Sequence, residues 1–501
     1  MHRGGSLAAE SAVELRRRIG TKEISPVELL EACIERIGRV DPAVNALAAT
    51  CFERARLEAR SAEAAALRGD PLGLLHGLPI GIKDLEETAG LLTTFGSPLY
   101  RHHVPERDSA MVARLRAAGA IVVGKTNTPE FGAGANTRNP VWGATGNPFD
   151  PMLNAGGSSG GSAVALACDM LPLCTGSDTG GSLRIPAAMC GVVGLRPSPG
   201  LVSSDQRSLG WSPISVLGPM GRSVADASLL LAAQAASDDR DPLSYPVEGH
   251  RYASLKPVDL GSLRIAWTEN FGICPVESSI QKDFRAKVAA FRHLFRSCEP
   301  VQFDFGAADR CFDVIRAINF VDRFRDIYVR DPDSLGPNVR ANYEAGSRMT
   351  LADVAWAHAE QTRIYRNFQQ VFREFDLVVA PTTAVTPFPW TQLYLAEIEG
   401  TPLLNYYHWL SLTYVITLAT NPAISLPCGL DHASMPFGLQ VIGRFRGDYE
   451  LLGTAQAMER AFEAVPGLQR PRPDIEKLSV PTPGLKSIVT HPAAASESFV
   501  R

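Results

Sequence analysis

Residues 155–183 read A-G-G-S-S-G-G-S-A-V-A-L-A-C-D-M-L-P-L-C-T-G-S-D-T-G-G-S-L, and the rest of the chain is organised around them. Two Gly-Gly-Ser clusters, at 156–158 and 180–182, flank an apolar segment that begins with helical character and ends with strand character. Glycine allows close approaches that other residues do not, so both clusters predict loops whose main chain comes near another group. Serine hydroxyls and backbone N–H groups at both loops favour a reacting carbonyl as that group, with two flexible Ser/Gly turns as the alternative.

The overall composition is that of an ordinary globular protein. Of 501 residues, 45% are hydrophobic and 20% are charged, and the formal net charge is −4. There is no basic surplus that would favour a nucleic-acid partner, and no run approaches the roughly 18 apolar residues of a membrane span. The first residues contain no apolar signal segment, so we expect a cytoplasmic protein.

Cysteine and histidine spacing gives no sign of disulfides or metals. The nine cysteines are odd in number and form no C-x-x-C pair, which predicts free, mostly buried thiols in a reducing compartment. The ten histidines lack spacings such as H-x-x-x-H, so we expect no metal.

Strand and helix patterns alternate along the chain. Apolar runs predict strands at 78–84, 120–123, 191–195, 264–268, 301–305, 377–381, 423–427 and 437–442. Helical patterns cover much of 6–69 and recur at 108–118, 223–236, 278–295, 308–330, 351–374, 407–418 and 447–464. This alternation predicts an α/β fold with a mixed, mostly parallel sheet covered by helices on both faces.

We divide the chain into three parts. Residues 1–70 form a helical segment packed on the core, 71–470 the catalytic domain, and 471–501 a Pro/Ser-rich tail expected to be partly disordered, above all after Val489. Within the domain, the variable region 300–420 contains two stretches without clear periodicity, at 320–350 and 383–410. Such stretches are candidates for pocket walls or a lid, and their aromatic residues are Tyr328, Tyr343, Trp390, Tyr394, Tyr406, Tyr407 and Trp409.

Two motif matches do not fit their usual context. Residues 119–126 satisfy G-x-x-x-x-G-K-[ST], but the expected strand occupies the variable positions, which leaves no phosphate cradle. Residues 156–160 satisfy G-x-S-x-G, but the preceding segment 147–154 is polar and carries two prolines instead of forming a strand. His408 and His432 could supply the histidine of such a triad, but neither has a distinguishing context.

A lysine at the end of a strand can serve as the base that a serine nucleophile needs. Lys83 follows the apolar run 78–82, where burial could lower its pKa by the two to three units, roughly, that a neutral amine requires. Taken alone, a lysine at a strand end is usually a surface charge. Ser158 could relay a proton from Ser182 to Lys83, and the loop 178–182 offers backbone N–H groups for an oxyanion. Asp178 and Arg184 fit a role in bracing this loop.

These residues resemble the amidase signature family of serine hydrolases. The resemblance rests on G-I-K-D at 81–84, G-G-S-S-G-G-S-A at 156–163, G-S-D-T-G-G-S-L-R-I-P-A at 176–187, and C-G-V-V-G-L-R-P at 190–197. It continues into P-A-I-S-L-P-C-G at 422–429 and P-F-G-L-Q-V-I-G at 436–443, and it spans about residues 10–465. Ser177 stands where the family often has threonine.

The resemblance implies a Ser–Ser–Lys triad on a single α/β/α sandwich of about eleven strands, with no cofactor. Lys83 would be the base, Ser158 the relay with a cis peptide bond, and Ser182 the nucleophile. The backbone of Thr179, Gly180, Gly181 and Ser182 would form the oxyanion hole, and Ser159, Asp178 and Arg184 would support the reacting groups.

The substrate is expected to be a small aryl or bulky apolar amide, because the variable region is rich in aromatic residues. Phe131, Gly132 and Gly134 are candidates for its acyl side. A carbamate or an ester remains an alternative on the same triad. A glutaminase subunit of a tRNA-dependent amidotransferase and a non-catalytic binding protein are the other classes. A homodimer is the family-level expectation.

Overall fold

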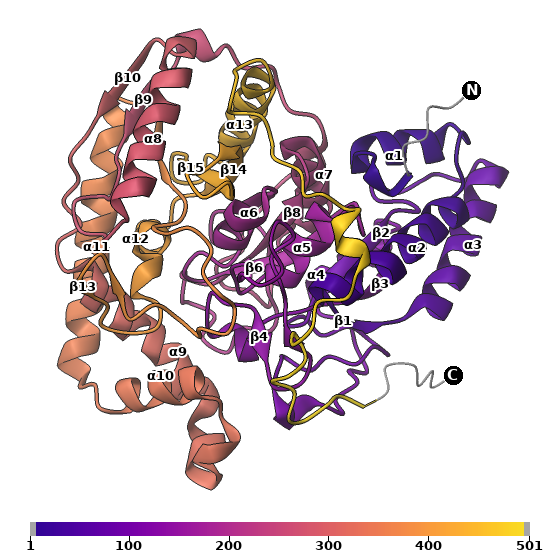
Figure 1. Ribbon diagram of the computed structural model, residues 1–501, viewed down its shortest axis with the longest axis horizontal. Coiled ribbons are helices and arrows are strands. Elements are labelled where there is room, and N and C mark those ends of the chain that lie inside the picture. The colour runs from indigo at the N-terminus through magenta and orange to yellow at the C-terminus, as the bar shows by residue number, and fades with distance from the viewer. Residues whose placement is uncertain (1–6, 495–501) are drawn as a thin grey trace.

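The computed structural model describes residues 7–494, and an eleven-stranded mixed sheet runs through them (Figure 1). The strands lie in the order β1 (Leu47–Thr50), β3 (Ile121–Thr126), β2 (Pro79–Lys83), β6 (Leu173–Asp178), β8 (Val216–Gly221), β7 (Val193–Arg196), β14 (Ala423–Leu430), β15 (Pro436–Ile442), β11 (Leu377–Pro381), β9 (Arg264–Trp267) and β10 (Ser297–Pro300). Two further two-stranded ribbons pair β4 (Arg138–Asn139) with β5 (Gly143–Ala144), and β12 (Glu397–Ile398) with β13 (Thr401–Pro402).

The sheet is mixed, but the expectation that it is mostly parallel was wrong. Parallel pairing joins β3 to β2, β2 to β6, β11 to β9 and β9 to β10. The other six neighbouring pairs in this sheet are antiparallel, including the continuous run from β6 to β11. Strand β8 was not predicted from the sequence, because its residues V-L-G-P-M-G contain the two residue types least common in strands.

Helices cover both faces of the sheet. The helices in the described part of the chain are α1 (Ala12–Gly20), α2 (Pro26–Val44), α3 (Phe52–Arg68), α4 (Ala110–Ala117), α5 (Gly160–Ala167), α6 (Arg184–Cys190), α7 (Val224–Gln234), α8 (Ser278–Phe291), α9 (Ala308–Arg330), α10 (Pro337–Ser347), α11 (Leu351–Gln370), α12 (Ser411–Ala419) and α13 (Asp448–Glu463). Helix α5 packs on β6 and β2, and α6 packs on β15, β14 and β7. Helix α7 packs on β8 and also contacts α1, α4 and α13.

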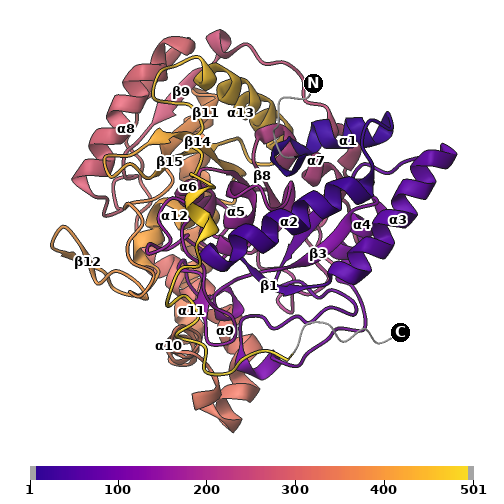
Figure 2. The same ribbon diagram turned by 45° about the vertical axis from the view of Figure 1, so that its right-hand side comes forward.

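The C-terminal segment packs against helix α2 of the N-terminal segment. The N-terminal segment forms α1 to α3 and also supplies the edge strand β1, which pairs with β3. A short turn at Lys477–Ser479, yellow in Figure 2, lies against α2 and buries Leu478. The Thr490 N–H then donates to the Pro140 carbonyl over 3.0 Å. The expected disorder of the tail remains a prediction for residues 495–501, which lie outside the described residues.

One main apolar core spans the sheet and its helices. All nine cysteines are buried and free, which confirms that part of the sequence prediction. No helix among residues 7–494 is long and apolar enough to cross a membrane.

Two expected elements differ from the structure. The strand expected at 301–305 forms four residues earlier, as β10, because its partner β9 ends at Trp267 and leaves little backbone to pair with. Val301 makes one more hydrogen bond to the Trp267 carbonyl, and the alternation beyond it buries Phe305 in the core. Residues 320–350 were expected to be irregular but are mostly helical, in α9 and α10.

Candidate active site

Lys83, Ser158 and the loop that carries Ser182, all predicted from sequence, meet at one edge of the sheet. Strands β2 and β6 are parallel neighbours, so their carboxyl ends, at Lys83 and Asp178, lie side by side. Helix α5 starts at this edge, directly after Ser158 and Ser159. The Ser159 N–H donates to the Ser182 carbonyl over 3.2 Å, which holds the two serine loops together.

The Lys83 amine is surrounded by hydroxyl groups. Its Nζ lies 2.8 Å from Ser158 Oγ, 2.8 Å from Ser159 Oγ and 3.0 Å from Ser177 Oγ. A neutral amine has two N–H donors and one lone pair, so it can donate to two of these hydroxyls and accept a proton from the third. The peptide bond between Gly157 and Ser158 is cis, as the resemblance implies. Sequence reasoning did not single out Ser177 as a contact of Lys83, although its position at the end of β6 could have indicated it.

Burial gives Lys83 the properties of a base. The side chain is fully buried, and this burial lowers its pKa to about 7, against the charges of Glu86 and Asp178, which favour the protonated form. A substantial fraction of Lys83 is therefore neutral at physiological pH. This is the condition under which a lysine can accept a proton.

The Ser182 hydroxyl is left available. Ser182 is half-buried, and within the described residues its Oγ makes no hydrogen bond, including none to Ser158 Oγ. Of the four predicted oxyanion donors, the Gly181 N–H is already taken, because it donates to Asp178 Oδ1 over 2.9 Å. The N–H groups of Thr179, Gly180 and Ser182 have no acceptor in the part of the chain that the structure describes.

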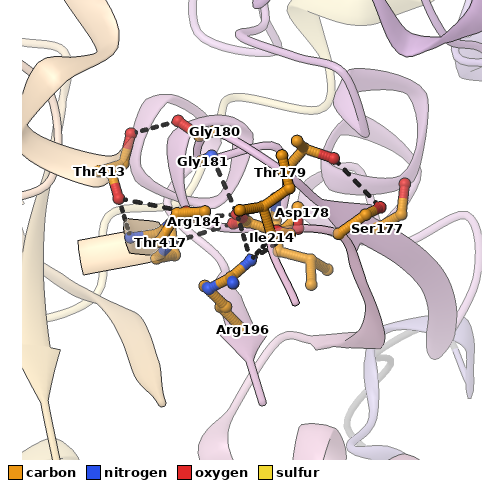
Figure 3. Close-up of polar contacts among 12 residues, drawn as sticks. Ser177, Asp178, Thr179, Gly180, Gly181, Arg184, Arg196, Ile214, Thr413 and Thr417 are labelled. Carbon is orange, nitrogen blue, oxygen red and sulfur yellow. Dashed lines mark hydrogen bonds and ion pairs between the residues drawn. The ribbon is translucent and has the colours of Figure 1, made fainter. Parts of the chain in front are cut away.

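A buried ion pair fixes the loop that carries Ser182 (Figure 3). Asp178 accepts two bonds from the Arg184 guanidinium, over 2.9 and 3.0 Å, and one from Arg196 over 3.3 Å. Burial alone would raise the Asp178 pKa, but the two guanidinium groups outweigh it and hold this pKa below its usual range. Asp178 also accepts from the Leu183 N–H, so its carboxylate supports the turn from inside.

Arg184 and Thr413 connect this loop to the C-terminal half of the domain. Arg184 donates to the Thr413 carbonyl over 2.9 Å and to Gln440 Oε1 over 2.6 Å, so it joins α6 to α12 and β15. The Thr413 hydroxyl in turn donates to the Gly180 carbonyl over 2.6 Å. Only glycine fits at 181, where φ is +126° and a Cβ would lie 2.6 Å from Ile185 Cδ1.

Ser158 and Ser182 open into a cavity of about 630 Å³. Serine hydroxyls and Thr179 line it together with aromatic, charged and polar side chains. The aromatic residues of the lining are Phe95, Tyr100, Phe131, Phe320 and Phe324, and the ionisable ones are Glu86, Glu87, His103, Arg207, Arg316, Asp322 and Arg323.

The three candidate substrate residues do not all lie at this cavity. Phe131 and Gly132 line it, whereas Gly134 does not. Gly134 instead lines a separate hollow of about 400 Å³ next to Pro129 and Asn338. The chain turns sharply at Phe131 and Gly132, where φ is +49° and +72°, and this turn separates Gly134 from the cavity. A substrate contact at Gly134 stays a prediction.

The aromatic wall comes from residues other than those expected. None of the seven aromatic residues singled out at 320–350 and 383–410 is among the lining residues. Tyr328 and Tyr343 stack on each other with ring centroids 4.2 Å apart, in an apolar cluster that also contains Phe131 and Phe324. Trp409 packs against Phe388 in the core. The aromatic lining consists instead of Phe95, Tyr100 and Phe131, from loops that follow β2 and β3, and of Phe320 and Phe324, which do lie in the stretch 320–350.

Neither the G-x-x-x-x-G-K-[ST] match nor the G-x-S-x-G match has the structural surroundings that its usual function requires. Gly124 and Lys125 are inside strand β3, so residues 119–126 form no phosphate-binding loop. His408 contacts Asp309 over 3.1 Å and His432 contacts Asp283 over 3.0 Å, and neither histidine lines the cavity.

Comparison with known proteins identifies the family of this chain. The model of the family described as Amidase matches residues 28–452. A glutamyl-tRNA(Gln) amidotransferase subunit of Acaryochloris marina is 34% identical over 90% of this chain and 97% of its own length. An acylamidase of Rhodococcus erythropolis is 33% identical over 90% of this chain and 94% of its own.

Solved structures give the same result. The crystal structure of a bacterial aryl acylamidase matches with a TM-score of 0.85 and 28% identity, over 91% of this chain and 97% of that one. Its family is the amidase signature family, which was the resemblance stated from the sequence motifs. The chain therefore belongs to the amidase signature family and is a hydrolase that acts on carbon–nitrogen bonds.

Proposed function

We propose that the protein is a stand-alone amidohydrolase that cleaves a small aryl or bulky apolar amide through an acyl-enzyme on Ser182. The observation that carries this proposal is the cavity itself. It brings the Ser182 hydroxyl, the Lys83–Ser158 pair and five aromatic side chains to one space of about 630 Å³.

Each reacting group has a step to perform. The Ser182 Oγ attacks the amide carbonyl and gives its proton to Ser158 Oγ, while Ser158 passes its own proton to the neutral Lys83 amine. The protonated Lys83 then returns a proton through Ser158 to the leaving nitrogen, and the amine departs. Water attacks the Ser182 ester in the second half, with the same groups moving the proton, and releases the acid.

Backbone N–H groups would hold the charge that develops on the carbonyl oxygen. Thr179, Gly180 and Ser182 have N–H groups that are free of partners in the described chain, whereas Gly181 is occupied by Asp178. We therefore assign the oxyanion hole to the first three and give Gly181 a conformational role. The Asp178 ion pair with Arg184 keeps these donors fixed before the substrate arrives.

The size and lining of the cavity favour an aryl or bulky group. Five aromatic side chains reach the lining, and a space of about 630 Å³ is larger than a small ammonia-releasing amide would fill. The acylamidase and aryl acylamidase among the similar proteins support this assignment. Carbamates and esters fit the same chemistry and remain alternatives. A homodimer stays a prediction.

A glutaminase component of a tRNA-dependent amidotransferase is the second candidate. It is favoured by the 34% identity with the Acaryochloris marina amidotransferase protein and by the charged wall of the cavity. Such a protein would work in a complex and would release ammonia from glutamine for a partner.

A substrate panel separates these functions. Purified protein would be assayed for amine release from anilides, primary amides, aryl carbamates and glutamine. We expect turnover to be greatest on the anilides and to be measurable without any partner chain. Turnover of glutamine alone would contradict the proposal and would favour the amidotransferase component.

The pH profile should show the titration of Lys83. Because the neutral amine is the reactive form, kcat/KM is expected to rise as the pH increases through about 7, and to fall about tenfold per pH unit below it. The Glu86 carboxylate favours the protonated amine, so Glu86→Gln should move this limb to lower pH. A profile that is flat between pH 5 and pH 8, roughly, would contradict Lys83 as the base.

A further inference from the structure

One face of helix α9 forms a wall of the cavity and carries two guanidinium groups. Arg316, Asn319, Phe320, Asp322, Arg323 and Phe324 line the cavity from this helix. All of them except Asp322 lie three, four, seven or eight residues from Arg316, which places them on one side of the helix. Arg316 and Arg323 are two turns apart, so both charges face the same cavity.

Arg323 is an exposed residue whose guanidinium lies over aromatic rings and has no acceptor for its N–H groups in the described part of the chain. The guanidinium carbon is 5.2 Å from the centre of the Phe131 ring and 5.6 Å from the centres of Phe95 and Phe324. Rings interact with the flat face of the group and leave its N–H edge unused. Within the described residues, Arg323 makes no hydrogen bond and no ion pair.

Arg316 is a second charge without a carboxylate partner. Only 7% of the residue is exposed, and its guanidinium donates to Asn342 Oδ1 over 3.2 Å and to the Tyr406 hydroxyl over 2.6 Å. Both acceptors are neutral, and among residues 7–494 Arg316 forms no ion pair. Arg207, the third arginine of the lining, differs because it is paired with Asp241.

The carboxyl groups of the lining are engaged elsewhere. Burial raises the pKa of Glu86 to about 7, so this group is partly neutral near physiological pH. Asp322 accepts a hydrogen bond from Ser208, and Glu87 lies 3.6 Å from the His103 ring. None of the three forms an ion pair with Arg316 or Arg323.

We propose that the Arg316 and Arg323 wall of α9 binds an anionic group of the substrate, so the preferred amide carries a carboxylate in addition to its aryl or apolar part. The inference rests on the proposed amidohydrolase function and specifies its substrate class. Arg323 can meet a carboxylate with two parallel N–H donors while its face remains stacked on the rings. The carboxylate belongs to either the acyl or the amine side of the amide.

Matched pairs of substrates test the preference on the unmodified protein. On the acyl side, glutaric acid mono-4-nitroanilide would be compared with its methyl ester. On the amine side, N-acyl-4-aminobenzoate would be compared with the corresponding 4-carboxamide. We expect kcat/KM to be about 10- to 100-fold higher for the carboxylate member of at least one pair, and the pair that shows it identifies the side.

Variants on α9 assign the preference to Arg323. Arg323→Met should reduce the ratio of kcat/KM between the carboxylate and neutral members by about tenfold or more, and Arg323→Lys should restore part of it. Arg325→Met is the matched control, because Arg325 is exposed on the same helix and does not line the cavity. This control should keep the wild-type ratio. Thermal unfolding checks that each variant is folded.

The possible results are distinct. Equal turnover of both members of both pairs would overturn this inference and leave the amidohydrolase proposal in place. Failure of the protein to hydrolyse any member would overturn both. A carboxylate preference that survives in Arg323→Met would show that Arg323 does not cause it, and this result also overturns the inference.

Discussion

Replacing Ser182 with alanine is expected to lower kcat for an anilide by about 10⁴- to 10⁶-fold. The proposed mechanism passes through an ester on Ser182 Oγ, which lies at the cavity without a hydrogen-bond partner among the described residues and beside the unpaired N–H groups of Thr179 and Gly180. The measurement is amine release under saturating substrate, with the residual rate compared with the uncatalysed rate.

The same variant should remain folded. Because the Ser182 Oγ makes no hydrogen bond within the described residues, its removal leaves no buried partner unsatisfied, and the melting temperature should change by no more than about 2 °C. A variant that unfolds early would leave the loss of activity without a catalytic explanation. A folded variant with more than about one hundredth of the wild-type rate would contradict Ser182 as the nucleophile.

Replacing Lys83 is expected to lower kcat by about 10³-fold or more, whether the new residue is methionine or arginine. Methionine removes the base and leaves Ser158, Ser159 and Ser177 without the amine they surround. Arginine retains a positive charge and donors, but its guanidinium stays protonated at any accessible pH and cannot accept a proton from Ser158.

The pair of Lys83 variants distinguishes a base from a structural cation. If Lys83 only held the hydroxyls in place by donating to them, Lys83→Arg would keep a large part of the activity. Activity in Lys83→Arg above about one tenth of wild type would therefore contradict the base assignment. Thermal unfolding of both variants measures the separate cost of altering this buried group.

Much of the site could be predicted from sequence because its parts are local. Lys83 ends an apolar run, and Ser158 and Ser182 lie in Gly-Gly-Ser clusters on either side of a helix and a strand. Parallel pairing of β2 with β6 then places the lysine next to the loop of Ser182. Each of these features depends on a few consecutive residues, so the pattern is readable without knowing distant contacts.

The walls of the cavity could not be predicted in the same way. Phe95 and Phe131 reach Phe324 from segments about two hundred residues away, and nothing in their local sequence indicates this. Trp409 and Tyr406 are aromatic, as expected of pocket residues, but they do not line the cavity. Trp409 packs against Phe388 in the core, and the Tyr406 hydroxyl accepts a hydrogen bond from Arg316. Aromatic content alone does not distinguish a pocket wall from the core behind it.

The sequence pattern also did not predict the direction in which the central strands run. The expected alternation of strands and helices is typical of parallel sheets, but β7, β8, β14 and β15 pair antiparallel in the middle of this one. Residues 216–221 contain Gly218 and Pro219 in a central strand, a position where local preferences oppose the structure. Tertiary packing decides the pairing there.

Reaction with an aryl fluorophosphonate, followed by peptide mapping, tests the central claim most directly. The reagent phosphonylates an activated serine with loss of fluoride and stays attached, so the modified residue can be identified by mass spectrometry. The account predicts a single adduct on Ser182, formed much more slowly in Lys83→Arg and absent in Ser182→Ala. An adduct on another serine, or no adduct on a protein that hydrolyses anilides, would contradict it.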